Sequence, residues 1–147
     1  TVDSSAAVHI DPHRVEIHTP TDFVLPPDGV HIRWPDDWLG QERRVITVKQ
    51  PAALAYWRAN RLDRVMLGRP DARFGIVTVG KSYLDVRQAL DELGLDDAEV
   101  ERLGLAIYKV GMVWPLETEG ATAFALGKRE ILVVEEKRAL IEQQLKD

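Results

Sequence analysis

The sequence predicts an α/β domain with a mostly parallel β-sheet, preceded by an irregular N-terminal segment. From residue 75 onward, short β-rich runs alternate with helical patterns, and glycines follow the helical patterns at positions 94, 104 and 127. Before residue 75, recurrent prolines interrupt any regular pattern. We therefore expect residues 1–74 to form a segment with short strands and one helix, packed on an α/β core formed by residues 75–147 of the same domain.

The overall composition is that of a globular protein. The chain has 147 residues, 45% of them hydrophobic, which is enough for one domain with a hydrophobic core. A net charge of -5 argues against nucleic acid or an anionic membrane as the main partner. No apolar run approaches the roughly 18–20 residues that span a bilayer, and no signal peptide is recognisable. Because Cys is absent, these residues hold no disulfide or Cys-ligated metal cluster, and we expect a cytoplasmic location.

The elements follow in order from these patterns. In the N-terminal half, the apolar stretches 15–18, 30–34 and 44–49 suggest short strands, and Pro51 suits the start of a helix. In the C-terminal half, Ser82 is expected to cap a helix with Asp85 three residues on. Alternation of this kind indicates right-handed crossovers and a sheet covered on both faces. The expected elements are a helix at 51–62, strands at 75–79, 106–113 and 131–135, and helices at 82–93, 96–103, 117–126 and 136–146.

Gly75–Ser82 matches the G-x-x-x-x-G-K-[ST] pattern of a phosphate-binding loop. Such a loop needs free backbone N–H groups, whereas the middle residues, Ile76–Val79, are β-branched and favour a strand. We therefore interpret the match as a strand followed by a turn at Gly80. A stand-alone nucleotide-binding domain that uses this loop is the alternative function, and a non-enzymatic interaction module is another.

The carboxyl edge of the predicted sheet is where a function is expected. Open α/β sheets present ligands and partners at the carboxyl ends of their strands. Glu135 and Glu136 could act there as an acid or base, although the first turn of a helix is the more usual place for such residues. The candidate residues for this sheet-end or interface role are Lys81, Ser82, Tyr83, Trp114, Pro115, Glu135 and Glu136.

Two further groups of side chains leave alternatives open. His9, His13 and His18 lie close together in the sequence, and two histidines four residues apart on a helix can bind zinc. Pro12 disfavours that helix, so exposed or capping histidines are the preferred interpretation. Trp34 and Trp38 lie in the irregular half, where they could either mark a domain interface or pack locally.

Three blocks in order, Gly75–Leu90, Tyr108–Glu117 and Glu130–Lys146, resemble one region of indolepyruvate ferredoxin oxidoreductase, and residues 46–65 resemble the segment that precedes it. The resemblance implies core domain II of the 2-oxoacid:ferredoxin oxidoreductases, which is similar to the transketolase C-terminal domain. That domain is a three-layer α/β/α unit whose mixed sheet is parallel except at one edge.

The resemblance also implies an activity for the complete enzyme. An arylpyruvate, coenzyme A and oxidised ferredoxin give an aryl-acetyl-CoA, carbon dioxide and reduced ferredoxin, with thiamine diphosphate, Mg²⁺ and an iron–sulfur cluster as cofactors. The family's G-D-G motif is absent from this chain, and Asn60 is the only Asn. We therefore expect a structural and assembly domain that is inactive alone and has no catalytic, cofactor-binding or metal residue. Its expected partners are the other domains of the oxidoreductase, with homodimer formation possible, and ferredoxin and coenzyme A for the complete enzyme.

Overall fold

The computed structural model describes residue 7 and residues 9–147, and its centre is a four-stranded sheet in the order β1-β3-β2-β4. The strands are β1 (Arg64–Leu67), β2 (Phe74–Val79), β3 (Leu105–Val110) and β4 (Glu130–Val134). β2 pairs in parallel with both β3 and β4, while β1 pairs antiparallel with β3 at the edge. The three strands expected in the C-terminal half are confirmed, and the sheet is mixed and parallel except at one edge.

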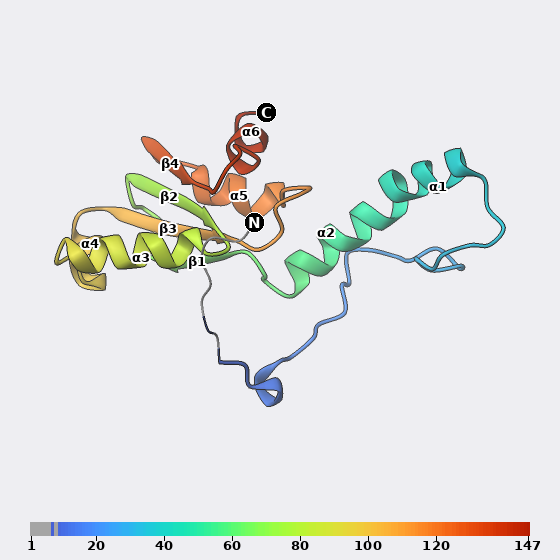
Figure 1. Ribbon diagram of the computed structural model, residues 1–147, viewed down its shortest axis with the longest axis horizontal. Helices are drawn as coiled ribbons and strands as arrows, with labels where there is room; N and C mark the ends of the chain where they lie inside the picture. The colour runs from blue at the N-terminus through green and yellow to red at the C-terminus, as the bar shows by residue number, and fades with distance from the viewer. Residues whose placement is uncertain (1–6, 8) are drawn as a thin grey trace.

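Helices cover both faces of this sheet and make three layers (Figure 1). Side chains along β3 alternate between the faces: Tyr108 and Val110 contact the layer of α5 (Thr118–Ala125) and α6 (Ile141–Lys146), as their shared core cluster shows. Ile107 faces the layer of α3 (Ser82–Glu92) and α4 (Asp97–Arg102). The α/β/α architecture expected from the sequence is therefore present.

The N-terminal half differs from the expectation of short strands and one helix. After a short 3-10 helix, η1 (Pro12–Arg14), the chain forms one continuous helical run of α1 (Trp38–Arg44), the π-helix η2 (Val45–Lys49) and α2 (Gln50–Ala59). We call this run the helical arm, because it projects from the core in Figure 1. Asp37 caps it by accepting a hydrogen bond of 2.7 Å from the Gly40 N–H.

The prediction of short strands is therefore wrong for three stretches of this half. Residues 44–49 are helical, since the flanking helices continue through them and override the β preference of Val and Ile. Residues 15–18 and 30–34 form no strand. The strand in this half is β1, so the sheet takes its antiparallel edge from upstream of residue 75.

The helix α3 begins at Ser82 as expected, but the expected cap of this helix and the expected start of the last helix are wrong. Lys81 is the N-cap of α3, with no side-chain cap bond, and Ser82 is the buried first residue of the helix. The last helix begins at Ile141 rather than at residue 136. The Glu135 carboxylate accepts hydrogen bonds from the backbone N–H groups of Leu140, Ile141 and Glu142, so it caps α6 from outside instead of lying in its first turn.

None of the described helices is both long and apolar enough to cross a membrane.

Candidate functional site

A small hollow lies at the carboxyl edge of the sheet, where the candidate residues were expected. Its volume is about 220 Å³. Four of the seven candidates line it, and they come from the end of β2 and the end of β4. The lining residues are Val79, Gly80, Lys81, Ser82, Val113, Glu135, Glu136, Arg138 and Leu140.

Two of the four charged side chains of this hollow serve the local structure. Lys81 pairs with Asp85 one helical turn away, and Glu135 is committed to capping α6. The hollow is also smaller than the roughly 300–1,000 Å³ of typical ligand pockets. Lys81 and Glu135 therefore do not form an uncommitted acid–base pair in this small hollow.

The other three candidates lie outside the hollow. Tyr83 packs on the α3 face of the sheet, with Lys109 Nζ 5.0 Å from its ring centre. Trp114 and Pro115 belong to the loop that follows β3, and the Trp114 side chain is 62% exposed. Gln144 of α6 holds this loop through two 2.8 Å hydrogen bonds, accepting from the Leu116 N–H and donating to the Val113 carbonyl. Trp114 is thus presented to the outside from a loop that is tied to the core.

The residues that match a phosphate-binding loop form the central strand. Gly75–Val79 belong to β2, which is hydrogen-bonded on both sides, with Gly75 in register with Ala106 on one side and Ile131 on the other. Their backbone groups are used in the sheet and cannot cradle a phosphate. Gly80, with φ of +56°, makes the turn out of the strand. The interpretation as a strand and turn is confirmed.

A polar cluster that the sequence did not reveal centres on Asp63, between α2 and β1. One carboxylate oxygen accepts hydrogen bonds of 2.7 Å from both Trp57 Nε1 and the Gly111 N–H, and the other lies 3.4 Å from the Tyr108 hydroxyl. The three donors come from the helical arm, β3 and the loop after β3. Asp63 therefore joins the arm to the sheet.

Glu117 forms the second half of this cluster. It is 4% exposed, and it caps α5 by accepting from the backbone N–H groups of Glu119 and Gly120. Arg58 of the arm lies 3.5 Å from the Glu117 carboxylate and 3.0 Å from that of Asp22. The hydrogen bond to Asp22 is the largest contribution that raises the pKa of Arg58. An ion-pair network thus connects the arm, the N-terminal segment and α5.

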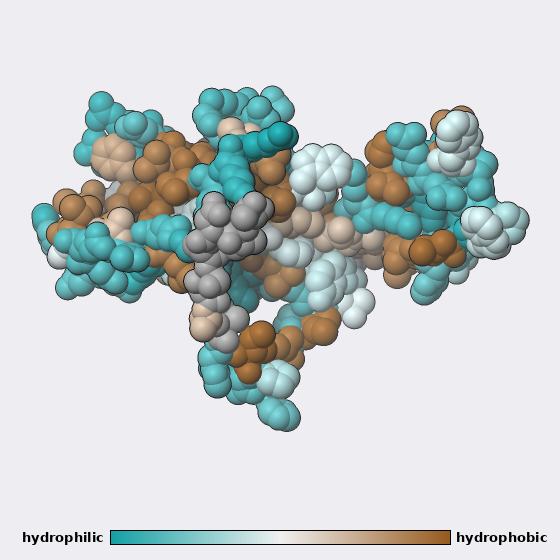
Figure 2. Space-filling model, viewed as in Figure 1, coloured by the Kyte–Doolittle hydropathy of each residue, from teal (hydrophilic) through white to brown (hydrophobic). Residues whose placement is uncertain are grey.

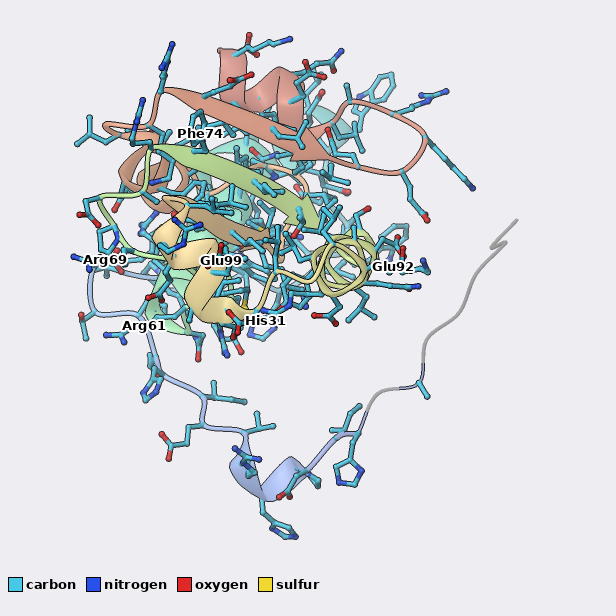
Figure 3. All side chains as sticks on the ribbon, turned by 90° about the vertical axis from the view of Figure 1, so that its left-hand side faces the viewer. His31, Arg61, Arg69, Phe74, Glu92 and Glu99 are labelled. Atoms are coloured by element: carbon cyan, nitrogen blue, oxygen red, sulfur yellow. The ribbon has the colours of Figure 1, made fainter. Side chains whose placement is uncertain are left out.

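Asp63 and Glu117 border a large groove of about 1210 Å³ between the end of the arm, β1 and α5. Arg61 and Arg69 are also among its lining residues, and Figure 3 shows them at the same edge of the core. No sequence motif marked this groove, since its walls come from residues that are far apart along the chain.

Tyr108 provides a prediction for alkaline pH. Burial, followed by the negative charges of Asp63 and Glu117, raises its pKa well above the ordinary value of about 10. The folded state therefore keeps Tyr108 protonated where the unfolded chain ionises. Its contribution to stability is complete below about pH 10 and is lost as the pH rises further. We expect Tyr108→Phe to reduce this alkaline loss of stability, as measured by urea unfolding at a series of pH values; an unchanged pH dependence would contradict it.

The described residues contain no group of three or more His, Asp or Glu side chains that could hold a metal ion, and His9, His13 and His18 form no such group. The fold is thus a three-layer α/β/α domain with a mixed sheet that is parallel except at one edge. The chain belongs to the indolepyruvate oxidoreductase domain family, whose model matches residues 64–147. The match begins at β1, the antiparallel edge strand.

Curated relatives carry the same region within much longer chains. Indolepyruvate oxidoreductase subunit IorA of Thermococcus kodakarensis and that of Pyrococcus horikoshii are each 34% identical over 79 residues, 54% of this chain and 11% of the relative. The IorA subunit of Methanothermobacter thermautotrophicus is 31% identical over 84 residues, 57% of this chain and 12% of the relative. The matched region thus spans about a ninth of these relatives. No solved structure shows significant similarity to the chain.

Proposed function

We propose that this chain is an assembly domain of a thiamine-diphosphate-dependent indolepyruvate:ferredoxin oxidoreductase. The complete enzyme would convert an arylpyruvate and coenzyme A into an aryl-acetyl-CoA, with carbon dioxide released and ferredoxin reduced. The observation that carries the proposal is the family match over the whole sheet, since the relatives in which this region lies are named indolepyruvate oxidoreductase subunits. The domain holds the cofactor-bearing parts in place and contributes to a homodimer in the cytoplasm.

Exposed apolar surface supports the assembly role. Trp34 and Trp38 are 90% and 83% exposed, and Ile46 is also exposed further along the arm. Figure 2 shows apolar side chains, in brown, at the surface of the projecting arm. Trp114 adds an exposed aromatic ring at the carboxyl edge of the sheet. Large apolar side chains gathered at the surface are typical of interfaces with other domains.

The cofactors of such an enzyme do not fit the residues present. Mg²⁺ bound to a diphosphate needs several oxygen ligands in near-octahedral order, and the described residues contain no group of three or more His, Asp or Glu side chains that could hold a metal ion. The chain has no Cys to hold an iron–sulfur cluster. The thiamine diphosphate and the cluster therefore belong to other parts of the oxidoreductase, and the chain alone is inactive.

Isothermal titration calorimetry of the isolated chain tests this division of roles. With Mg²⁺ present, neither thiamine diphosphate nor ATP should give saturable binding. Micromolar binding of thiamine diphosphate would contradict the assembly role. Binding of ATP that disappears in Lys81→Ala would instead support the alternative function at Gly75–Ser82.

The assembly role also predicts the effect of removing the exposed ring at the carboxyl edge. Trp114→Ala should weaken association of the chain with the rest of the oxidoreductase about tenfold, because aromatic side chains often dominate interfaces. It should leave thiamine diphosphate binding by the assembled enzyme intact. Leu93→Ala is the matched control: Leu93 is 72% exposed, and since α3 runs back from the carboxyl edge, it lies at the opposite edge. Equal effects of the two variants on association would contradict the prediction.

A further inference from the structure

The groove beside α5 is a surface of the sheet that the helices leave uncovered. Val65 of β1 lies in register with Tyr108 of β3, so both side chains point to the same face and form the floor. Ala123 and Phe124 of α5 line one wall, and the end of the arm lines the other. Phe124 stacks on Tyr108 with ring centres 5.0 Å apart. The middle of the groove is therefore apolar and aromatic.

The border of the groove is positive, although the chain as a whole carries a net charge of -5. Five Arg or Lys side chains line it against three carboxylates. The cations are Arg58, Arg61, Arg64, Arg69 and Lys128, and the carboxylates are Asp63, Glu117 and Glu119.

The three carboxylates already have hydrogen-bond or ion-pair partners within the domain. Asp63 accepts from Trp57 and Gly111, Glu117 caps α5, and Glu119 lies 3.5 Å from Arg58. Among the described residues, none of these three carboxylates forms an ion pair with Arg61, Arg64 or Lys128.

Three of those cations have no carboxylate within ion-pair distance in the described part of the chain. Arg64 Nε donates to the Arg61 carbonyl at 2.9 Å. Lys128 Nζ lies 3.5 Å from the Pro70 carbonyl and 4.5 Å from the centre of the Phe124 ring. Arg61 itself is exposed at the end of the arm. Positive charge that is not neutralised beside an apolar floor is complementary to a ligand with both carboxylates and apolar groups.

The size of the groove favours a polypeptide over a small molecule. Its volume of about 1210 Å³ exceeds the usual range for small-molecule sites. In the curated relatives, close to nine-tenths of the polypeptide lies outside the matched region and is available to cover such a surface.

We propose that this groove docks an acidic segment of the remaining oxidoreductase polypeptide. Apolar side chains of the segment pack on Val65 and Phe124, and its carboxylates pair with Arg61, Arg64 and Lys128. The inference rests on the assembly role proposed above, and it adds the docking surface and the chemistry of the partner.

Site-specific photo-cross-linking within the purified, complete oxidoreductase tests the docking. A photoreactive phenylalanine replaces Ala123, which is exposed in the wall of the groove. The matched control replaces Ala98, which is exposed on α4 at the other face of the sheet. We expect position 123 to cross-link to one segment outside this chain that contains Asp or Glu next to apolar residues, with a yield at least fivefold above that of position 98.

Charge-reversal variants test whether the docked segment forms ion pairs with the groove or merely lies near it. Arg61→Glu, Arg64→Glu and Lys128→Glu should each lower the cross-linking yield about tenfold. Arg129→Glu, which changes an exposed cation next in sequence to Lys128 but outside the groove, should leave it unchanged. If a reversal variant fails to fold, as judged by thermal unfolding, the corresponding Gln variant replaces it, with a smaller loss expected in the same direction.

The outcomes distinguish the docking surface from the assembly role. If the chain remains in the complex but position 123 cross-links no better than position 98, or cross-links to a basic segment, the docking inference is wrong and the assembly role stands. If the chain does not associate with the oxidoreductase at all, both are wrong. If ATP, added as a probe, binds the isolated chain and Arg64→Glu abolishes that binding, the groove is a small-molecule site and the inference is overturned.

Discussion

Gly68→Ala should lower the free energy of unfolding by about 3–5 kcal/mol, because the added methyl group combines backbone strain with steric overlap. Gly68 directly follows β1 and has a φ of +91°, a conformation that L-residues rarely adopt. A Cβ atom there would meet the Leu105 carbonyl oxygen and lie 2.5 Å from the Ala106 Cα. Both are backbone atoms of β3, so relief requires a shift of the central strands and not of one side chain.

Gly94→Ala is the control that separates this collision from backbone strain. Gly94 has a similar positive φ, +71°, but no atom lies within 4 Å of where its Cβ would be. It should cost only about 1–2 kcal/mol, the price of the left-handed conformation alone. Urea unfolding followed by circular dichroism measures both variants. A Gly68→Ala effect no larger than that of Gly94→Ala would contradict the predicted contact between β1 and β3.

Asp63→Ala should lower the free energy of unfolding by about 2–4 kcal/mol. The substitution removes two charge-assisted hydrogen bonds of 2.7 Å and leaves the half-buried Trp57 Nε1 without an acceptor. Because these bonds join the helical arm to the end of β3, amide hydrogen exchange should also rise in α2 before it rises in the central strands.

Two variants make the Asp63 result specific. Asp63→Asn keeps one acceptor oxygen and should cost less than Asp63→Ala. Asp71→Ala removes an exposed carboxylate whose partner, Arg69, is also exposed, and should cost no more than about 1 kcal/mol. If Asp63→Ala were as mild as Asp71→Ala, the link between the arm and the sheet would carry little of the stability.

The order of elements from β2 to β4 could be predicted from the sequence because its signals are local. Ile76–Val79 favour a strand by their own side chains, and the glycines at 94 and 104 end α3 and α4 by positive φ. The carboxyl edge was likewise predictable, because parallel strands end at one edge. Lys81, Ser82, Glu135 and Glu136 do line one hollow there.

Other predictions from local sequence were wrong where the local structure depends on the rest of the fold. The run 45–49 has the composition of a strand, yet it is a π-helix that continues the two flanking α-helices and belongs to no sheet in the described part of the chain. The start of α6 depends on Glu135, which reaches across five residues to cap it. β1 has four residues, three of them exposed, and therefore lacks the alternation by which a strand is recognised.

The α/β alternation, the family resemblance and the sheet edge that carries Lys81 and Glu135 could all be recognised in the amino-acid sequence. The hydrogen bond of Asp63 with Gly111, 48 residues away, depends on the packing of distant segments. The same holds for the position of Arg64 and Lys128 at one groove. Most of these helices and strands are set by side chains a few positions apart in the sequence, and their order gives the α/β alternation. A charged cluster or an open groove depends instead on which part of the sheet the short helices cover. That coverage arises only when segments distant in the sequence pack together.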